Sequence, residues 1–368
     1  MAACCSELVP YLKAVDGRIL EYLRSSDLVK RLEPADIEEG VLSYIQRPGK
    51  RMRPALLLMA CGSVGGEERE ARAVPAAAGV ELFHTWTLVH DDLIDNDNVR
   101  RGQPTVHEAM TQRARAACGF DDALAREYGR DIAILSGDIQ HGWSVTCFLD
   151  CALRMGVDPL VIVQVVKYLQ SYVVPELVRG EVLDIQSGMK KGRDVSGIDE
   201  EKIINMLRLK TGVLYEFAAM AGTLIGKNTT AMDDPQVQAI RHFASNCGIA
   251  FQLQDDVLGV TGDENTLGKP VGSDIREGKM TVAVYHALSH ANGKEKERIL
   301  SVLGNRAASR DAIAEVTALL EELGGVDRCR ALARGYLDKA LPYLDALEES
   351  GYRRLLVQWA DFMIDRES

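Results

Sequence analysis

The chain has 368 residues, of which 46% are hydrophobic, and its 54 acidic and 43 basic residues give a net charge of −11. This composition supports a globular protein with a sizeable core, and the length suits one large domain or two smaller ones. The excess of acidic residues argues against a nucleic-acid-binding protein. An acidic protein that handles an anionic substrate needs local cations, so clusters of Lys and Arg are informative here.

The cysteines and the N-terminus indicate the cellular compartment. Eight cysteines, at positions 4, 5, 61, 118, 147, 151, 247 and 329, form no CxxC pair. Such thiols fit a reducing cytoplasm better than a disulfide scaffold. The first dozen residues lack the regions of a signal peptide, and no apolar run approaches the ~20 residues that span a bilayer. We therefore expect a cytoplasmic protein that does not span a membrane.

Helical periodicity dominates the chain, and strand signals are scarce. Apolar residues recur at helical spacing over residues 4–24. Met52–Ser63 and Ala71–Asp95 are rich in alanine and almost free of helix breakers, as buried helices are. Asp158 and Asp234 each precede a proline, which predicts two N-caps. Further helices are predicted over Asp131–Met155, Pro159–Ser187, Glu200–Ile225, Pro235–Leu258, Thr281–Ala291, Glu295–Leu303, Ser309–Leu323 and Asp327–Glu348.

The segments rich in glycine and proline are short, at residues 47–49, 98–104, 187–197 and 259–278. The last is too long for a simple connection between helices, and ordered loops of that length are often lids or binding loops. No linker, repeat or low-complexity tract is present. The pattern predicts a single all-α domain of ten or more helices with a buried central set.

A first acidic cluster closes the predicted helix Ala71–Asp95. Asp91 and Asp95 are four residues apart, so their carboxylates lie on one face of a helix. An acidic helix end in solvent is the alternative, but the preceding residues are apolar and carboxylates there meet the unfavourable end of the helix dipole. A bound cation offsets that cost. Oxygen ligands without nearby His or Cys favour Mg²⁺, so Asp91, Asp92 and Asp95 are candidate metal ligands.

A second acidic cluster, Asp255 and Asp256, closes another apolar helical run. Gln252 shares a helical face with Asp256. Taken alone, these residues are equally well explained as flanking the glycine-rich loop. Two such clusters on separate long helices of an all-α protein predict a joint metal site, because helical bundles build sites from facing helices.

Basic residues accompany both acidic clusters. Any one of them alone is better explained as a solvated surface cation. Arginine grips a diphosphate through two parallel hydrogen bonds, whereas lysine acts as a point charge. Carboxylates for a metal beside cations for phosphate therefore predict a diphosphate site. The candidate cations are Lys50, Arg53, Arg100, Arg101, Lys210, Lys269 and Lys279.

Taken in order, these motifs resemble those of the trans-type (head-to-tail) isoprenyl diphosphate synthases, especially the short-chain geranylgeranyl and farnesyl diphosphate synthases. The motifs lie at residues 49–54, 91–102, 210–211, 251–256 and 268–279. The resemblance implies mostly antiparallel helices around a deep central cavity, in one polyprenyl synthase domain spanning 1–368 whose first 25 residues hold an N-terminal helix. It also implies a homodimeric transferase of isoprenoid biosynthesis.

The resemblance further implies an Mg²⁺-dependent condensation of isopentenyl diphosphate with an allylic diphosphate (dimethylallyl, geranyl or farnesyl) by ionisation, condensation and elimination. Two or three Mg²⁺ ions would be held by Asp91, Asp95 and Asp255, with Asp92 and Asp256 beside them. The allylic phosphates would also contact Arg100, Lys210 and Lys269. Isopentenyl diphosphate would bind Lys50, Arg53, His84 and Arg101. Thr211 and Gln252 would place oxygens near the allylic cation.

His84 carries an alternative interpretation of its own, since a lone histidine in a helix is more often a core residue than a ligand. It precedes Asp91 by seven residues, two helical turns along the same face, which makes a contact with the second substrate geometrically sensible.

Three positions depart from the family pattern. Gly259 stands where many relatives have a third aspartate of the second cluster, so the metal role there rests on Asp255. Glu181 stands where a glutamine is common, although Asp184 is retained. Finally, only two residues separate Asp92 from Asp95, without the extra pair of typical bacterial farnesyl diphosphate synthases.

Product length should depend on the residues one turn before the first acidic cluster. Trp86, five residues before Asp91, is the largest available stopper, and the next residue, Thr87, is small. In the family, one bulky residue there with compact spacing suggests a C20 product, and two suggest C15. Trp143 and His141 are candidates to narrow the far end, although core packing alone also explains the tryptophans. We predict geranylgeranyl diphosphate, with farnesyl diphosphate as the alternative.

Two further alternatives remain open. A terpene synthase also ionises a diphosphate at acidic metal motifs, but it has no need for Lys50, Arg53 and Arg101. A catalytically silent regulatory subunit should have lost acids or cations, and Gly259 is the only departure in that direction among the metal motifs.

Overall fold

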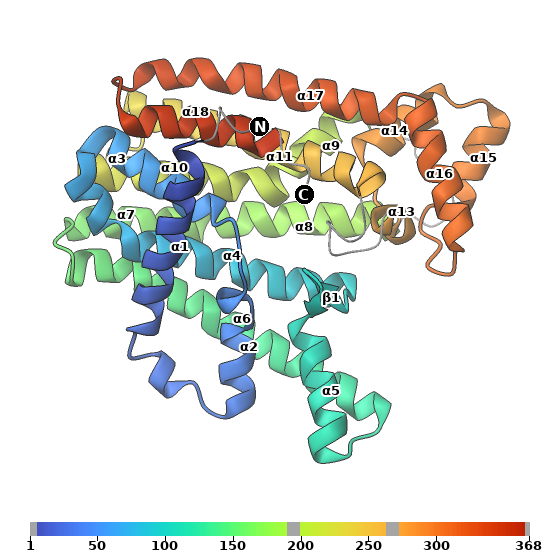
Figure 1. The fold of residues 1–368 in the computed structure, drawn as a ribbon, viewed down its shortest axis with the longest axis horizontal. Helices are drawn as coiled ribbons and strands as arrows, with labels where there is room; N and C mark the ends of the chain where they lie inside the picture. Colours follow the sequence, from blue (N-terminus) through green and yellow to red (C-terminus); the bar gives the residue numbers. More distant parts are fainter. Residues whose placement is uncertain (1–5, 190–198, 263–271, 365–368) are drawn as a thin grey trace. The chain divides into compact units, whose positions relative to one another are not determined.

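The computed structural model describes residues 6–189, 199–262 and 272–364 (Figure 1). Within these ranges nearly all regular structure is helical, and the one sheet is a hairpin of two-residue strands. The predicted all-α class is therefore confirmed. By contact density the chain divides into two compact units, each built from several stretches of sequence. The single-domain expectation stays a prediction.

The first unit comprises residues 1–168, 218–238 and 347–356. α4 packs most extensively along α6. The two backbones approach closely at Gly79, where an added Cβ would lie 2.9 Å from the carbonyl oxygen of Ser144. Its elements are α1 (Leu8–Arg24), η1 (Val29–Arg31), α2 (Ala35–Gln46), α3 (Met52–Arg72), α4 (Val74–Asp95), β1 (Val99–Arg100), β2 (Gln103–Pro104), α5 (Val106–Cys118), α6 (Asp122–Leu153) and α7 (Pro159–Tyr168).

The second unit comprises residues 169–217, 239–346 and 357–368. Two of its segments, η2 (Leu169–Val173) and η3 (Arg208–Gly212), are π-helical. Its other elements are α8 (Val174–Met189), α9 (Glu200–Leu207), α13 (Ser273–Glu277), α14 (Val282–His290), α15 (Gly293–Val302), α16 (Arg310–Glu322), α17 (Gly325–Ala340) and η4 (Leu341–Ala346). Three helices contribute residues to both units: α10 (Val213–Lys227), α11 (Pro235–Thr261) and α18 (Gly351–Ile364).

Most predicted helices are present, and both predicted N-caps are confirmed. Asp158 Oδ1 accepts a hydrogen bond from the backbone of Leu160 at 2.9 Å, and Asp234 Oδ1 accepts one from Gln236 at 2.9 Å. Four α-helices, α2, α5, α13 and α18, were absent from the sequence prediction, and α13 lies in the segment predicted as a loop. The π-helical segments inside the predicted helices Pro159–Ser187 and Glu200–Ile225 were also not foreseen, because one inserted residue shifts the apolar pattern by only one position.

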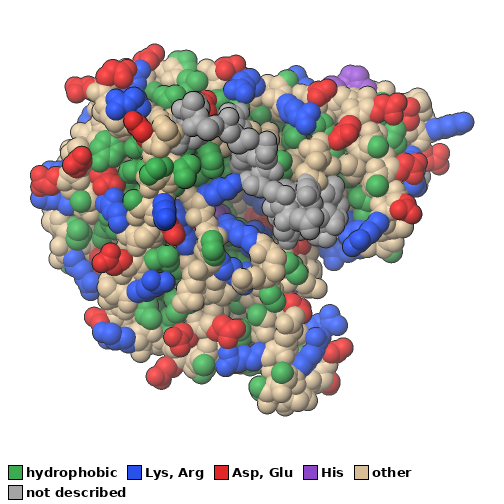
Figure 2. All heavy atoms as spheres, in the orientation of Figure 1, with side chains coloured by type: hydrophobic (Ala, Val, Ile, Leu, Met, Phe, Trp, Pro, Cys, Tyr) green, Lys and Arg blue, Asp and Glu red, His purple; other side chains and the backbone are tan. Residues whose placement is uncertain are grey.

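The surface and the helix lengths bear on the expected compartment. Acidic and basic side chains are interspersed over the face shown in Figure 2. The six cysteines in the described ranges are free thiols. Among described residues one helical stretch, Pro159–Gly188, is long and apolar enough to cross a membrane by length and composition, with 33% of its most apolar window buried. One such helix is weak evidence, and the absence of a membrane span stays a prediction.

Candidate active site

The first acidic cluster lies at the C-terminal end of α4. Asp91 and Asp95 are partly exposed, whereas Asp92 is buried and accepts a hydrogen bond from the hydroxyl of Tyr44. Arg100 Nε donates to Asp92 Oδ1 at 2.7 Å, and Arg100 Nη2 lies 3.5 Å from Asp91 Oδ2. Because both Asp92 oxygens are engaged, its structural role is to hold Arg100 beside the cluster. The metal role predicted for Asp92 stays a prediction.

A tight hairpin sends two adjacent arginines to different partners. β1 pairs with β2 in the register Arg100 to Gln103, and the two loop residues, Arg101 and Gly102, have φ angles of 53° and 71°. Positive φ at both loop positions is the type I′ geometry that matches the strand twist. Arg100, at the end of β1, reaches the acids, whereas Arg101, in the loop, donates from Nη1 to the carbonyl oxygen of Pro48 at 2.9 Å.

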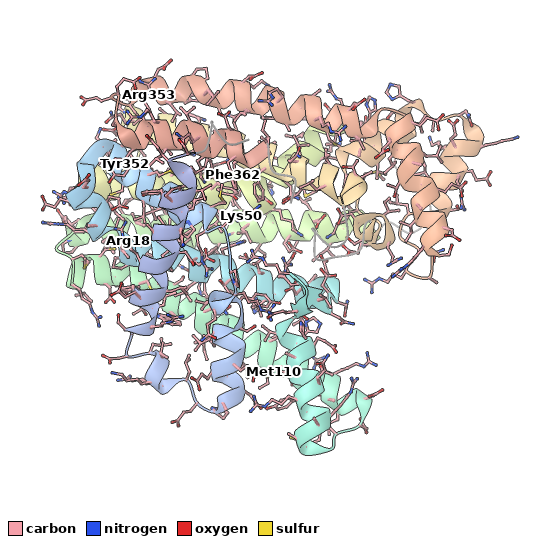
Figure 3. The ribbon with its side chains drawn as sticks, in the orientation of Figure 1. Arg18, Lys50, Met110, Tyr352, Arg353 and Phe362 are labelled. Carbon is pink, nitrogen blue, oxygen red and sulfur yellow. The ribbon has the colours of Figure 1, made fainter. Side chains whose placement is uncertain are left out.

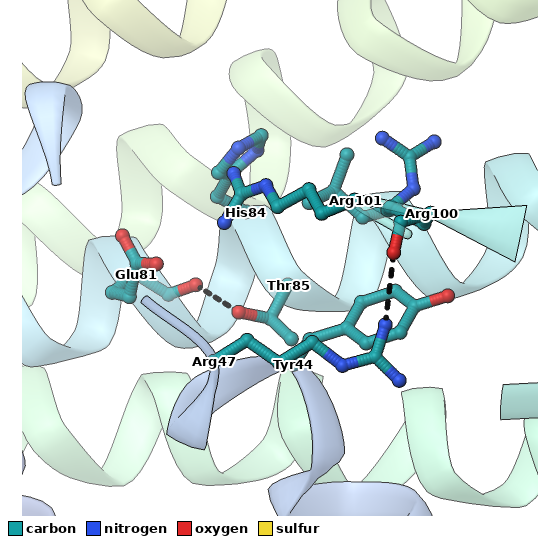
Figure 4. A pocket seen from close by; sticks show the side chains of 8 residues that line it. Tyr44, Arg47, Glu81, His84, Thr85, Arg100 and Arg101 are labelled. Carbon is teal, nitrogen blue, oxygen red and sulfur yellow. Dashed lines mark hydrogen bonds between the residues drawn. The ribbon is translucent and has the colours of Figure 1, made fainter. Parts of the chain in front are cut away.

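A small basic pocket, partly open to solvent, lies beside this hairpin (Figure 4). His84 faces Arg53, with His84 Nε2 3.2 Å from Arg53 Nη1. Burial, and then the charge of Arg53 and of the neighbouring arginines, lowers the pKa of His84 well below its ordinary value of 6.5. The imidazole is therefore neutral near pH 7 and leaves anion binding to the guanidiniums. The pocket is lined by Tyr44, Arg47, Glu81, His84, Thr85, Leu88, Arg100 and Arg101.

Arg51 is a site residue that the sequence analysis missed. It has a left-handed backbone (φ 45°), is 4% exposed, and donates to Asp16 at 2.7 Å, to Glu81 and to the carbonyl oxygen of Ile45 at 2.6 Å. These contacts fix the turn that precedes α3, in which Lys50 is exposed (labelled in Figure 3). Its place in the motif at 49–54 was the available signal, but nothing in the sequence distinguished its buried charge from its neighbours.

In the second unit, Lys210 lies between two carboxylates. Its Nζ donates to Asp184 Oδ2 at 2.7 Å and lies 2.9 Å from Glu181 Oε2. The structure thus brings the predicted cation Lys210 together with the two acids whose roles the sequence left open. Without an anionic ligand, these acids balance the charge of Lys210.

The predicted residues Thr211 and Gln252 are joined to the second acidic cluster. Thr211 Oγ1 donates to Gln252 Oε1 at 2.9 Å, and Gln252 Nε2 donates to Asp256 Oδ1 at 3.3 Å. Asp256 Oδ2 is buried and has no hydrogen-bond partner among described residues. Burial first, then the nearby carboxylates of Asp274, Asp255 and Asp184, raise the pKa of Asp256 well above its ordinary value. A cation here would relieve this repulsion, so the donor set fits Mg²⁺.

Few protein ligands are available to any one ion. Among described residues no group of three His, Cys, Asp or Glu side chains is arranged to hold a metal. Mg²⁺ normally takes one or two carboxylates and leaves its other positions to water and substrate phosphate. A side chain at Gly259 would place its Cβ 3.1 Å from Asp274 Oδ2, so Asp274 takes up part of the space of the missing third aspartate.

The remaining predicted cations divide between described and undescribed residues. Lys279 Nζ lies 2.8 Å from Glu277 Oε2. Lys269 lies outside the described residues, so its predicted phosphate contact is not placed.

The predicted length-determining residues form part of an aromatic cluster on α4 and α6. The ring of Trp86 lies 4.9 Å from Phe83 and 4.7 Å from His141 between centroids. The hydroxyl of Thr87 donates to the carbonyl oxygen of His84 at 2.8 Å. Trp143 is 1% exposed and is among the largest fully buried side chains. His141 therefore provides a ring contact from α6 to Trp86, and the role of Trp143 stays a prediction.

Comparisons with family models and with known proteins agree on one family. The polyprenyl synthetase family model matches residues 35–320. The chain is 33% identical over 357 residues to the short chain isoprenyl diphosphate synthase of Methanothermobacter thermautotrophicus, covering 97% of both chains.

Two solved structures show the same fold. Geranylgeranyl pyrophosphate synthetase from Pyrococcus horikoshii has a TM-score of 0.77 at 32% identity, covering 96% of this chain and 95% of that one. Geranylgeranyl pyrophosphate synthase from Corynebacterium glutamicum, complexed with isoprenyl diphosphate and magnesium, has a TM-score of 0.84 at 26% identity, covering 98% and 99%. The family match over most of the chain and the relative aligned along nearly all of it agree with the motifs, and the chain belongs to the polyprenyl synthetase family.

Proposed function

We propose that this chain is an Mg²⁺-dependent short-chain prenyltransferase that condenses isopentenyl diphosphate with allylic diphosphates, with geranylgeranyl diphosphate as its main product. The observation that carries the proposal is the hairpin of the first unit, which holds Arg100 on the acidic end of α4 and Arg101 at the basic pocket. An acidic metal-binding end and a cationic phosphate pocket thus adjoin each other, as two diphosphate substrates require.

The allylic diphosphate has to become a good leaving group. Asp91, Asp95 and Asp255 would hold two or three Mg²⁺ ions, with Asp92 and Asp256 beside them. When bound, Mg²⁺ supplies Lewis-acid neutralisation of the charge that develops on the leaving diphosphate. Arg100 and Lys210 would add positive charge at the allylic phosphates, and Lys269 is assigned to them as well; such charge would stabilise the developing anion. Lys210 then exchanges the carboxylates that balance it for the substrate.

Isopentenyl diphosphate is assigned to the basic pocket. Arg53 and Arg101 bind its phosphates with Lys50 from the exposed turn, and neutral His84 donates or accepts one hydrogen bond without adding charge. Arg51 touches no substrate in this proposal. It fixes the turn from which Lys50 extends, and its partners Asp16 and Glu81 keep its own charge satisfied.

The chemical step breaks one bond and forms another. Cleavage of the allylic C–O bond yields a delocalised cation and pyrophosphate. The double bond of isopentenyl diphosphate attacks this cation, a C–C bond forms, and loss of a proton to pyrophosphate restores a double bond. The oxygens of Thr211 and Gln252 lie beside the second acidic cluster and are assigned to stabilise the cation, whereas apolar surroundings keep water from quenching it.

Product length is assigned to the aromatic cluster. The ring of Trp86 contacts the rings of Phe83 and His141, and we assign it as the obstacle that stops the growing chain. Thr87 is the small residue at the next position. This combination supports a C20 product, which is also the product named for the Pyrococcus and Corynebacterium relatives.

A direct assay tests the proposed reaction. Purified protein with Mg²⁺, isopentenyl diphosphate and each of three primers (dimethylallyl, geranyl and farnesyl diphosphate) should form geranylgeranyl diphosphate, read out by mass spectrometry. Dimethylallyl diphosphate alone should give no product. A cyclised hydrocarbon from the primer alone would favour a terpene synthase, and inactivity with all three primers would favour a regulatory subunit.

The proposed assembly is a homodimer in the cytoplasm. Exposed apolar side chains gather where α6 ends and α7 begins: Leu153, Leu160 and Val163 are 80%, 67% and 57% exposed. Exposed apolar patches mark interaction surfaces, and the commonest assembly of identical chains is a twofold dimer.

The assembly is testable by mass. Sedimentation of the purified protein should give twice the 40.4 kDa of one chain. The double variant Leu153→Glu with Leu160→Glu should shift it to one chain, because a charge at a dry interface is costly. Val9→Glu, at an exposed apolar position on α1, should leave the dimer intact. A monomeric parent protein would contradict the proposal.

A further inference from the structure

A buried charge cluster adjoins the π-helical segment η3, and none of the steps above uses it. Glu216, in α10, is 1% exposed. Arg208 Nε lies 2.8 Å from Glu216 Oε1, Arg241 Nε donates to Oε2 at 3.2 Å, and Ser245 Oγ donates to Oε1 at 2.7 Å. Burying a carboxylate costs desolvation free energy, which partners of this kind offset. These contacts therefore differ from those of an exposed ion pair, in which water solvates both charges.

The cluster brackets η3 in the chain. Arg208 is the first residue of η3, and Glu216 follows its last residue, Gly212, by four positions. Arg208 also donates to the hydroxyl of Tyr172 in η2. The carboxylate therefore fastens the start of the π-helical turn to the helix that follows it. π-helical turns are rare and occur frequently at functional sites. The contacts of Glu216 hold this one at its start and after its end.

Close backbone packing supports the same segment from two further helices. An added Cβ on Gly180, in α8, would lie 2.4 Å from the backbone nitrogen of Lys210. An added Cβ on Gly248, in α11, would lie 2.8 Å from the Cα of Gly212. Both distances are too short for any side chain, so the backbone of η3 is fitted tightly between glycines of its neighbours.

The π-helical turn sets the direction of two side chains. It aims Lys210 Nζ at Asp184, 2.7 Å away, and Thr211 Oγ1 at Gln252, 2.9 Å away. If the π-helical turn became α-helical, the side chains that follow it would turn by roughly 100° about the helix axis, the rotation of one residue. Lys210 and Thr211 cannot keep both contacts after such a rotation.

We propose that Glu216 is a positioning residue for the allylic half of the reaction. Its carboxylate, with Arg208, Arg241 and Ser245, holds η3 in its π-helical form and so keeps Lys210 and Thr211 aimed at the allylic diphosphate and cation. The inference rests on the proposed function, because it gives those two residues their purpose. It adds a residue that touches no substrate and lies outside every motif of the sequence analysis.

The test uses Glu216→Gln in the full-length protein, with Glu70→Gln as the matched control. Glu70 is also buried at 5% exposure, and its carboxylate accepts from Arg18 at 2.6 and 2.9 Å, but it belongs to the first unit. Both variants remove one buried charge and retain the side-chain volume. Thermal melting of each records the loss of stability that a merely structural role would produce.

The expected result is a change confined to one substrate. Glu216→Gln should lower kcat/KM for the allylic diphosphate by about tenfold or more, because misplacement of a catalytic group by about 1 Å costs up to roughly a hundredfold. Its KM for isopentenyl diphosphate should stay within about twofold of the parent value. Calorimetry with an unreactive allylic thiolodiphosphate and Mg²⁺ should show weaker binding. Glu70→Gln should melt earlier but keep both kinetic constants.

A milder variant covers the case in which Glu216→Gln does not fold. Ser245→Ala removes one hydrogen bond to the carboxylate and leaves every charge paired, and it should weaken allylic binding by about three- to fivefold, the loss of roughly one ordinary hydrogen bond. Unchanged allylic kinetics in Ser245→Ala, or in a folded Glu216→Gln, would overturn the inference. So would a rise in the KM for isopentenyl diphosphate as large as the loss of allylic thiolodiphosphate binding. Failure of the parent protein to condense the two substrates would instead reject the proposed function.

Discussion

Asp91→Asn should reduce turnover by about a thousandfold while leaving the protein folded. Asp91 is partly exposed at the end of α4, and Arg100 stays anchored by the buried Asp92. The folded structure therefore loses little. The reaction loses a ligand for the ion that neutralises the leaving diphosphate, a contribution of several kcal/mol at the transition state, and about 4 kcal/mol corresponds to a thousandfold.

The measurement is kcat with saturating substrates over a range of Mg²⁺ concentrations. Asp91→Asn should also need more Mg²⁺ for half-maximal rate, which a nonspecific loss of structure would not produce. Asp122→Asn is the matched control, because Asp122 is an exposed acid of the same unit that pairs only with Arg115 at 2.9 Å in the described structure, and it should retain parent activity. Parent-level turnover in Asp91→Asn combined with Asp255→Asn would refute the proposed function.

Trp86→Ala should lengthen the product beyond C20. The indole is part-exposed on α4, and the rings of Phe83 and His141 support it without filling its place. Truncation to alanine removes most of a side chain that buries about 150–250 Å² in typical proteins and opens room for at least one more isoprene unit. Each extra unit then adds apolar contact instead of a clash.

Mass spectrometry of the products from farnesyl and geranylgeranyl diphosphate as primers measures this change. Trp86→Phe is the matched variant, because it keeps an aromatic ring at the position and should retain a mainly C20 product. Trp143→Phe separates the two tryptophans, since Trp143 is fully buried and its contact with the growing chain is a prediction only. Unchanged product length in Trp86→Ala would remove Trp86 from the account and leave the proposed reaction intact.

The basic pocket illustrates how far a motif can be interpreted without a structure. Lys50, Arg53 and His84 were candidates because their residue types and spacing suit a diphosphate, and the structure places Arg53 and His84 in contact. Tyr44 and Arg51 were missed, because their roles depend on a buried hydrogen bond to Asp92 and on a left-handed turn. Neither feature changes the local pattern of residue types. The structure alone shows which neighbouring charge is exposed, as in Lys50, and which is buried, as in Arg51.

The sequence by itself determined the helical class and the family motifs, and it supplied most of the candidate residues of the site. These features are local: apolar periodicity, capping residues and acidic pairs four residues apart depend on positions close together in the chain. Only the tertiary structure decided that Asp92 anchors Arg100, that Lys210 is balanced by Glu181 and Asp184, and that Glu216 fastens a π-helical turn. Buried charges find partners far away in the chain, and the free energy of those pairings depends on desolvation and geometry that no local pattern records.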